Sequence, residues 1–359
     1  MDKKSITFVF SRPSISPVGG FKVIYEYANR LSNDGFEVHI VYDMFYSYSS
    51  MSMSEKFKQV LRYILANTTN HYSGRRWFNL NENIREHYTK SLKYKDICKT
   101  DIYVATAAET SFSVNEYPIS MENKGYLIQG YENWNLSDIE LKRTYHFNLK
   151  IMVISNWLKL IMDQEKVRCY ILKNGFDFDY FKLTVPIRAR SKYVITMLNH
   201  SDERKGVKYG IAALNLVKQK YPQIQVNMFG VPPRPSELPD WYHYYQTPDR
   251  TLHNKIYNEG AIFLATSLME GWGLTVGEAM ICGEAIVCTE VDGFKEMVKD
   301  GISALFSPIK DAQSLACNVI KLIENDEMRI GIAERANKDI KQFNWNASYK
   351  EFLNIFDLN

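Results

Sequence analysis

Cysteine clusters and long apolar runs are both missing from this sequence of 359 residues. The five cysteines are odd in number and widely spread, and none stands in a Cys-x-x-Cys or Cys/His ligand pattern. We therefore expect neither a disulfide framework nor a zinc site, and we expect a reducing, cytoplasmic compartment. The apolar stretch 6–10 is too short for the core of a signal peptide or for a membrane-spanning helix.

A strong excess of charge of one sign is missing as well. The chain has 44 Lys and Arg against 41 Asp and Glu, which gives a formal net charge of +3. A broad nucleic-acid-binding surface needs a concentrated basic face, so we expect no nucleic acid partner. Hydrophobic residues make up 45% of the chain, which is too many for a disordered protein, and the length indicates about two domains.

Strand-like and helix-like patterns alternate along the chain. Residues 6–10 predict a strand, a glycine turn follows, and Val23, Tyr27 and Leu31 recur at helical spacing before a second strand at 38–41. This strand–helix–strand order is the repeating unit of a parallel sheet. The same rhythm returns in the second half, with strands predicted at 193–198, 226–229, 262–265 and 286–288.

Residues 44–95 interrupt this rhythm. They carry nine Lys or Arg side chains against three Glu, with ten aromatic residues between them. A helical insertion whose charges are solvated would account for this composition. The alternative is a surface that contacts an anionic membrane or an anionic, lipid-linked acceptor.

The strongest chemical signal lies in the glycine-rich segment 267–280. A strand is predicted to end just before it, and a helix is predicted to begin near Thr275. Gly271 and Gly273 would let backbone N–H groups approach a ligand, and the helix start would supply donors and partial positive charge for a phosphate. Thr275 and Glu278 could instead form a capping box, which needs no ligand.

Glu270 and Glu278, separated by seven residues, resemble the E-x7-E signature of retaining, family-4-type nucleotide-sugar glycosyltransferases with the GT-B fold. Residues 126–134 also resemble a Gln-x-Tyr-Glu element of the rhamnosyltransferase-like branch. Shorter matches follow in the order of the family, namely Gly19-Gly20, Asn174-Gly175-Phe176-Asp177, Lys205-Gly206, Val291-Asp292-Gly293, Asp300-Gly301 and Phe343-Asn344-Trp345.

The resemblance implies an α/β fold of two Rossmann-like domains that face each other across a cleft. An acceptor-binding N-terminal domain would span 1–184, and a nucleotide-sugar-binding C-terminal domain would span 185–341. The terminal helix, within 342–359, would cross back to the first domain.

The resemblance also implies roles for individual residues. Lys205 and Arg204 would face the diphosphate, Glu270 would hold sugar hydroxyls near the reacting centre, and Glu278 would bind the ribose. The other expected donor contacts are Gly20, His200, Gly271, Trp272, Gly273, Leu274 and Thr275, and the expected acceptor-side contacts are Tyr131 and Glu132. GT-B enzymes usually need no metal, so no cofactor is expected besides the nucleoside-diphosphate sugar.

Two departures from the family pattern leave roles open. His200 stands where many relatives carry an arginine, so either His200 or Arg204 could take over a phosphate contact. The first-domain histidine near the reacting sugar has no clear match in the corresponding stretch 105–110. Glu132 could also be a surface residue on an aromatic loop rather than an acceptor contact.

The predicted function is transfer of a sugar to an acceptor hydroxyl, with retention of anomeric configuration, in the synthesis of a cell-surface polysaccharide or glycoconjugate. Such a protein would be cytoplasmic or peripheral at the inner face of the membrane, and segment 126–134 favours a deoxythymidine-diphosphate rhamnose donor. The alternatives are an inactive nucleotide-sugar-binding partner subunit and a nucleotide-sugar epimerase or hydrolase of the same fold. A NAD(P)-dependent dehydrogenase is disfavoured, because segment 16–20 lacks the Gly-x-Gly-x-x-Gly fingerprint.

Overall fold

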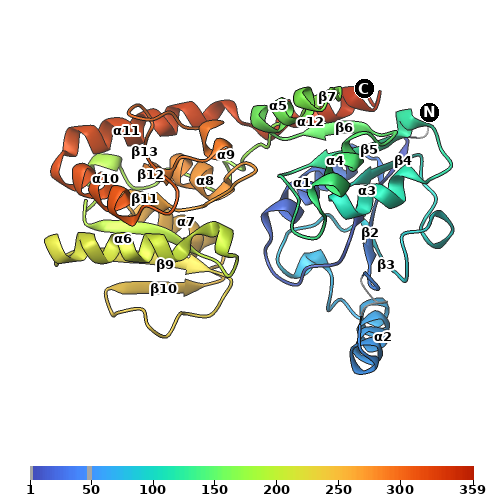
Figure 1. Ribbon diagram of the computed structural model, residues 1–359, viewed down its shortest axis with the longest axis horizontal. Coiled ribbons are helices and arrows are strands. Elements are labelled where there is room, and N and C mark those ends of the chain that lie inside the picture. Colours follow the sequence, from blue (N-terminus) through green and yellow to red (C-terminus); the bar gives the residue numbers. More distant parts are fainter. Residues whose placement is uncertain (1–2, 47–50) are drawn as a thin grey trace. The chain divides into compact units, whose positions relative to one another are not determined.

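The computed structural model describes residues 3–46 and 51–359. Residues 47–50, which belong to the basic and aromatic segment 44–95, lie outside the described residues. The chain divides into two units (Figure 1). The first unit comprises Met1–Asn174 and Asn346–Asn359, and the second comprises Gly175–Trp345.

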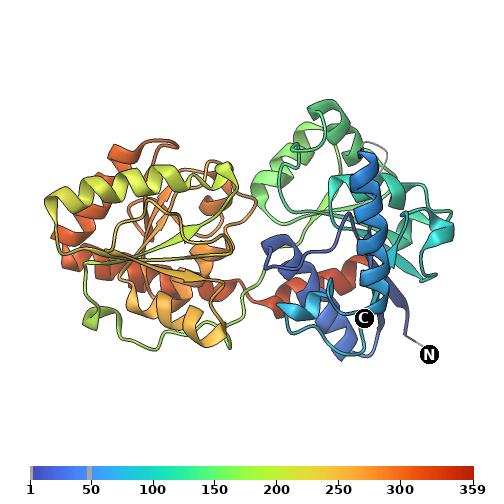
Figure 2. The same cartoon turned by 90° about the horizontal axis from the view of Figure 1, so that it is seen from below.

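A seven-stranded parallel sheet, ordered β3-β2-β1-β4-β5-β6-β7, forms the centre of the first unit. Its strands are β1 (Ser5–Phe10), β2 (Glu37–Asp43), β3 (Arg85–Thr89), β4 (Ile102–Ala105), β5 (Lys124–Ile128), β6 (Lys150–Val153) and β7 (Cys169–Ile171). The inner strands are buried along nearly their whole length, as expected for a parallel sheet with helices on both faces. Figure 2 shows helices on either side of this sheet.

The helices of the first unit follow the predicted pattern where apolar residues recur at helical spacing. The side chains of Val23, Tyr27 and Leu31 on α1 are almost completely buried. The longer helices are α1 (Gly19–Asn33), α2 (Met53–Thr68), α3 (Ala108–Asn115), α4 (Asp138–Tyr145) and α5 (Asn156–Gln164). Short 3-10 turns lie at η2 (Gly74–Arg76), η3 (Tyr94–Asp96) and η4 (Met121–Asn123).

Segment 44–95 contains more than a helical insertion. Its α2 is helical, but Arg85–Thr89 pair in parallel with β2 and form the edge strand β3. The sequence pattern did not predict this strand, because four of its five residues are polar and none is fully buried. An edge strand can carry such residues, since one of its long sides has no neighbouring strand.

The C-terminal helix α12 (Trp345–Ile355) packs on the first unit, which confirms the predicted crossing of this helix. The ring of Phe352 lies 5.2 Å from that of Tyr27 and 6.1 Å from that of Phe8, measured between centroids. The buried ammonium of Lys150 donates a hydrogen bond to the carbonyl oxygen of Ile355, at 2.7 Å. These contacts bury the apolar side chains of Phe352, Ile355 and Phe356.

The second unit holds a six-stranded parallel sheet, ordered β10-β9-β8-β11-β12-β13. Its strands are β8 (Val194–Asn199), β9 (Gln225–Gly230), β10 (Tyr242–Gln246), β11 (Ile262–Ala265), β12 (Ala285–Thr289) and β13 (Ala304–Ser307). Its helices are α6 (Val207–Lys220), α7 (Arg250–Glu259), α8 (Leu274–Cys282), α9 (Asp292–Lys295), α10 (Ala312–Glu324) and α11 (Asp326–Asp339), with 3-10 turns η5 (Ile187–Ala189), η6 (Glu203–Lys205) and η7 (Ile340–Gln342).

The two sheets give the chain the predicted α/β architecture of two Rossmann-like units. Leu214 on α6, Val226 on β9 and Leu315 on α10 all belong to one continuous hydrophobic core in the second unit. Within 3–46 and 51–359, no helix is both long enough and apolar enough to cross a membrane.

Candidate active site

The strand order of the second sheet reverses between β8 and β11. The chain runs from β8 outward to β9 and β10 on one side, and from β11 outward to β12 and β13 on the other. The loops that leave the carboxyl ends of β8 and β11 therefore start next to each other, which is the usual place for a ligand in an open α/β sheet. The first of these loops carries Lys205, and the second carries Glu270.

Lys205 and Glu270 form an ion pair at this point. The ammonium of Lys205 lies 2.7 Å from Oε1 of Glu270, and the same oxygen accepts a hydrogen bond from the hydroxyl of Ser267, also at 2.7 Å. The side chains of Lys205 and Glu270 are 27% and 11% exposed, so both are largely shielded from water but still accessible to a ligand. The structure thus brings together two of the residues that the sequence assigned to the reaction.

Gly206 makes this close approach of the two loops possible. Its φ of +62° is in the left-handed region, and a Cβ at this position would lie 2.0 Å from the carbonyl oxygen of Thr266. The loops are also joined by hydrogen bonds from the hydroxyl of Thr266 to the Lys205 carbonyl and from Leu268 N to the Arg204 carbonyl. Only glycine fits here without displacing the loop that holds Lys205.

Helix α8 begins at the end of the Glu270 loop. Its N-cap is Gly273, with φ +97°, and in the described part of the chain no side chain caps this end. The alternative of a capping box made by Thr275 and Glu278 is therefore wrong, because Thr275 already lies inside the helix. The first-turn amides of Leu274 and Thr275 stand at an uncapped helix start, which suits an anion.

Trp272 contributes to this turn differently from the other residues. Its side chain is buried, and its ring meets that of Phe343 edge to face at 5.3 Å between centroids. Gly271, Leu274 and Thr275 are partly exposed. If Trp272 contacts the nucleoside-diphosphate sugar, the contact would consequently come from its backbone.

Glu278 lies one turn into α8, and only 5% of it is exposed. Its Oε2 accepts a hydrogen bond at 3.1 Å from the hydroxyl of Tyr257 on α7. Burial, with the adjacent carboxylate of Glu278, raises the pKa of Tyr257 well above its usual value, so this hydroxyl keeps its proton and acts as a donor. Tyr257 was missed at the sequence level, because nothing in its local pattern links it to a residue 21 positions later.

Arg204 and His200 are oriented toward Asp202 on the same loop. The guanidinium of Arg204 donates through Nε to both carboxylate oxygens of Asp202, at 3.0 Å each, and the amide of Asp202 donates to Nδ1 of His200 at 2.9 Å. Both residues are exposed. Their predicted phosphate contacts remain a proposal.

In the first unit, the strand order likewise reverses between β1 and β4. Gly20, the second residue of α1, lies against Gln129, whose side-chain amide donates to the Gly20 carbonyl at 3.2 Å. Gln129 was part of the segment singled out in the sequence, but it was not assigned to the site. Tyr131, two residues later, is partly exposed.

Glu132 is buried rather than on the surface, so the surface interpretation of this residue is wrong. It is 4% exposed, and its Oε2 accepts hydrogen bonds from the Ala108 amide at 2.6 Å and the Tyr126 hydroxyl at 3.3 Å. The carboxyl group therefore ties the 126–134 segment to the start of α3. An acceptor contact through this residue remains a proposal.

The buried carboxyl group of Glu132 should make the folding stability depend on pH. Burial raises its pKa from 4.5 to about 8, so between these values the folded state holds a proton that the unfolded state releases. Stability should therefore fall as the pH rises through this window, by an amount on the order of a few kcal/mol from this residue. Denaturant unfolding of Glu132→Gln across the window should show a clearly flatter profile than wild type, whereas Glu116→Gln, an exposed glutamate of the same unit, should match wild type. A Glu132→Gln profile as steep as that of wild type would contradict the assignment.

Groups that could bind a metal ion are scarce in the described ranges 3–46 and 51–359. A single group of three such side chains lies close together there, formed by His39, His87 and Cys98 of the first unit. It includes none of the residues expected to contact the donor.

Comparisons with known proteins relate this chain to glycosyltransferases. Residues 185–339 match the family model described as "Glycosyl transferases group 1". Among curated proteins, a phosphatidyl-myo-inositol mannosyltransferase from Mycolicibacterium smegmatis is 22% identical over 171 residues, which cover 46% of this chain and 44% of that protein. An N-acetylgalactosaminyltransferase from Campylobacter jejuni that acts on N,N'-diacetylbacillosaminyl-diphospho-undecaprenol is 30% identical over 96 residues, 27% of this chain and 26% of that protein. The chain thus spans about half, or less, of the length of these curated relatives.

Solved structures match over almost the whole chain. Sucrose-phosphate synthase from Thermosynechococcus elongatus has a TM-score of 0.71 at 13% identity and covers 99% of this chain and 98% of its own. HepE from Anabaena, solved with UDP-glucose, has a TM-score of 0.70 at 15% identity and covers 98% and 99%. The chain therefore has the GT-B fold, and the match to the glycosyl transferases group 1 model lies within its second unit.

Proposed function

We propose that this protein is a retaining glycosyltransferase that moves a sugar from a nucleoside-diphosphate sugar to an acceptor hydroxyl. The observation that carries this proposal is the Lys205–Glu270 ion pair beside the uncapped start of α8. The cation and the first-turn amides of the helix suit the negative charge of the diphosphate. The carboxylate, at the same switch point, suits the hydroxyls of the sugar.

The leaving diphosphate gains negative charge as the glycosidic bond breaks. In the proposed site, Lys205 and the first-turn amides of α8, rather than a metal ion, stabilise this charge. Glu270 accepts hydrogen bonds from hydroxyls of the transferred sugar, and it neutralises Lys205 while no donor is bound. Glu278, oriented by Tyr257, accepts hydrogen bonds from the ribose.

The test is release of nucleoside diphosphate by the purified full-length protein, with a panel of nucleoside-diphosphate sugars, in the presence and absence of glycan acceptors. Acceptor-dependent release supports transfer. Equal release without any acceptor would favour a hydrolase, conversion of the sugar without release would favour an epimerase, and tight nucleotide binding without turnover would favour an inactive partner subunit. The inactive partner subunit is included as an outcome because the first-domain histidine of the family has no clear match in this chain.

The identity of the donor is the finer part of this proposal. HepE was solved with UDP-glucose, so uridine-diphosphate sugars belong at the head of the panel. The pattern Gln129-Gly130-Tyr131-Glu132 supports a deoxythymidine-diphosphate rhamnose donor instead. We propose a cell-surface polysaccharide or glycoconjugate as the acceptor, because two curated relatives are named for phosphatidylinositol and undecaprenol-linked substrates.

We also propose that segment 44–95 contacts an anionic membrane at the inner face of the cell, through α2. This helix is unusual because its apolar side faces outward: Met53, Phe57 and Ile64 are 80%, 66% and 51% exposed. The two buried residues of the helix are Gln59 and Ala66, on the opposite side. A helix that stabilised only the fold would have the reverse orientation.

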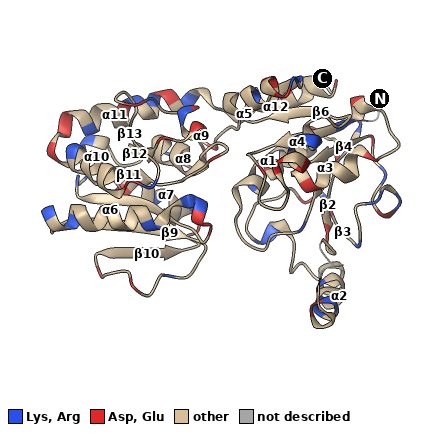
Figure 3. Cartoon of the chain, in the orientation of Figure 1, with Lys and Arg blue, Asp and Glu red and all other residues tan. Residues whose placement is uncertain are grey.

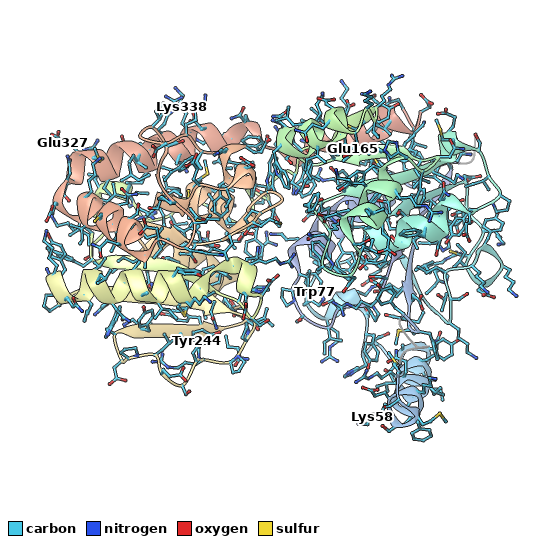
Figure 4. All side chains as sticks on the ribbon, viewed as in Figure 1. Lys58, Trp77, Glu165, Tyr244, Glu327 and Lys338 are labelled. Carbon is cyan, nitrogen blue, oxygen red and sulfur yellow. The ribbon has the colours of Figure 1, made fainter. Side chains whose placement is uncertain are left out.

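Basic side chains border this apolar side. At 100° per residue, Lys58 and Arg62 lie along one edge of the stripe that also includes Val60, Leu61 and Leu65. Figure 3 shows Lys and Arg positions in blue on α2, and Figure 4 labels Lys58 on this helix, which stands off the sheet of the first unit. An apolar stripe with a basic border fits the interface of a bilayer that contains anionic lipids.

Replacing Phe57 and Ile64 together by serine should weaken binding to anionic phospholipid vesicles by about tenfold or more, because two large apolar side chains are lost from the contact. The matched control replaces Ile139 and Leu160 by serine. These residues are 83% and 60% exposed on other helices of the same unit, and the control should bind like wild type. Co-sedimentation with vesicles measures the difference. Equal binding of all three proteins, or no binding of wild type, would contradict this role for α2 while leaving the proposal of sugar transfer untouched.

A further inference from the structure

We propose that His39, His87 and Cys98 form a binding site for a divalent transition-metal ion such as zinc in the first unit. The site goes beyond sugar transfer, since none of its residues belongs to the proposed donor or acceptor contacts. Two imidazoles and a thiolate are a ligand set that zinc prefers. No sequence motif indicates such a site, because its three residues come from three separate segments.

The sheet places the two histidines next to each other. In the register of β2 and β3, His39 pairs with Arg85, and His87 lies two residues further along β3. Side chains two residues apart share a face of a sheet, so both imidazoles point to the same side. Nδ1 of His39 lies 2.7 Å from Nε2 of His87, and the rings are stacked with centroids 5.0 Å apart.

Cys98 reaches the same face from the connection between η3 and β4. Its Sγ lies 3.5 Å from the hydroxyl of Thr7, and Thr7 is paired with His39 in the register of β1 and β2. The three possible ligand atoms all lie within 4.8 Å of one another. His39 is buried, whereas His87 and Cys98 are partly exposed, so an ion can enter from solvent.

The spacing is close to that of a tetrahedral site. Zinc-to-nitrogen distances of about 2.1 Å and zinc-to-sulfur distances of about 2.3 Å place neighbouring ligand atoms roughly 3.3–3.7 Å apart. The two imidazoles must separate slightly and the thiol must move slightly inward, which side-chain rotation achieves. The thiol proton is released to solvent, and the proton shared by the imidazoles moves to the outer nitrogen of its ring.

The outer nitrogen of His39 already has the partner that a metal-bound histidine usually has. Its Nε2 lies 3.2 Å from Oε1 of Glu37, and the same oxygen accepts a hydrogen bond from Arg85 at 2.8 Å. A carboxylate in this position orients the imidazole and makes it a better ligand. His87 lies on the edge strand β3, and Cys98 lies in the connection that leads into β4. A bound ion would therefore link the edge strand to this connection.

Cobalt(II) added to the purified, metal-free protein tests the proposal, because a thiolate ligand gives a sulfur-to-cobalt charge-transfer absorption in the near ultraviolet. Wild type should develop this absorption with about one equivalent of cobalt, and added zinc should abolish it. Cys98→Ser should lose the absorption, and His87→Gln should bind cobalt at least tenfold more weakly. Glu37→Gln, which keeps all three ligands, should bind about 10 to 100 times more weakly than wild type.

Cys317→Ser is the matched control, since Cys317 is an exposed cysteine of the second unit. It should keep the full absorption. Zinc should also raise the thermal unfolding temperature of wild type and of Cys317→Ser, but not that of Cys98→Ser. A missing charge-transfer band in wild type, or a band that survives in Cys98→Ser, would overturn the site.

Discussion

Lys205→Ala is expected to lower kcat for sugar transfer by about a hundredfold. The loss of one preorganised group that stabilises charge in a transition state typically has an effect of this size. Lys205 is the cation held by Glu270 at the switch point of the second sheet, at 2.7 Å. Lys208→Ala, which removes an exposed lysine one turn further on, should leave kcat unchanged. The kcat of both variants is measured by steady-state kinetics, with the nucleoside-diphosphate sugar that supports turnover of wild type.

Glu270→Gln should have a similar effect on kcat, because it removes the carboxylate that binds the sugar and positions Lys205. Since the two side chains share an ion pair, their effects should not add. The Lys205→Ala/Glu270→Gln double variant should be much closer to either single variant than to the product of the two losses. Rates near wild type in both single variants would remove these residues from the mechanism.

Glu278→Gln is expected to weaken the binding of the nucleoside diphosphate by about 10 to 100 times. Hydrogen bonds to a charged group contribute about 1.5–3 kcal/mol, and the amide has only one acceptor oxygen and no charge. Glu278 is buried, and Tyr257 fixes one of its oxygens at 3.1 Å. Calorimetric titration with the nucleoside diphosphate measures this effect without turnover.

Glu284→Gln provides a matched control for Glu278→Gln. Glu284 is also completely buried and lies just beyond Gly283, the C-cap of α8, and burial holds its pKa well above the usual value. A protonated glutamate and a glutamine are close in shape and charge, so this variant should bind the nucleoside diphosphate like wild type. Equal affinity of Glu278→Gln and Glu284→Gln would show that Glu278 has no direct role in binding.

The sequence predicted those parts of the fold that depend on local pattern. Buried strands such as β1 and β11 are short apolar runs in the sequence, and α1 has apolar residues at helical spacing. The close approach of Lys205 to Glu270 could also be expected, because the resemblance assigned both residues to the donor site. The structure confirms the two Rossmann-like sheets and the crossing of α12.

Other features depend on contacts between distant segments, and no local pattern reveals them. The strand β3 is rich in polar residues, so only its pairing with β2 identifies it. Tyr257 meets Glu278 because α7 and α8 pack together. The sequence left Glu132 as either an acceptor contact or a surface residue, and it did not reveal the contact of its buried carboxyl group with the start of α3. His39, His87 and Cys98 are separated by 48 and 11 positions. The sheet register brings the two histidines onto one face, and the connection between η3 and β4 brings Cys98 to it.

A crystal structure of the protein with a bound nucleoside diphosphate would locate the donor on the second unit. We predict that the diphosphate lies against the first-turn amides of α8, with the ammonium of Lys205 in contact with its oxygens and the carboxylate of Glu278 in contact with the ribose hydroxyls. A nucleotide bound elsewhere, with the start of α8 free and Glu278 in contact only with protein atoms, would contradict the proposed site and the reaction assigned to it.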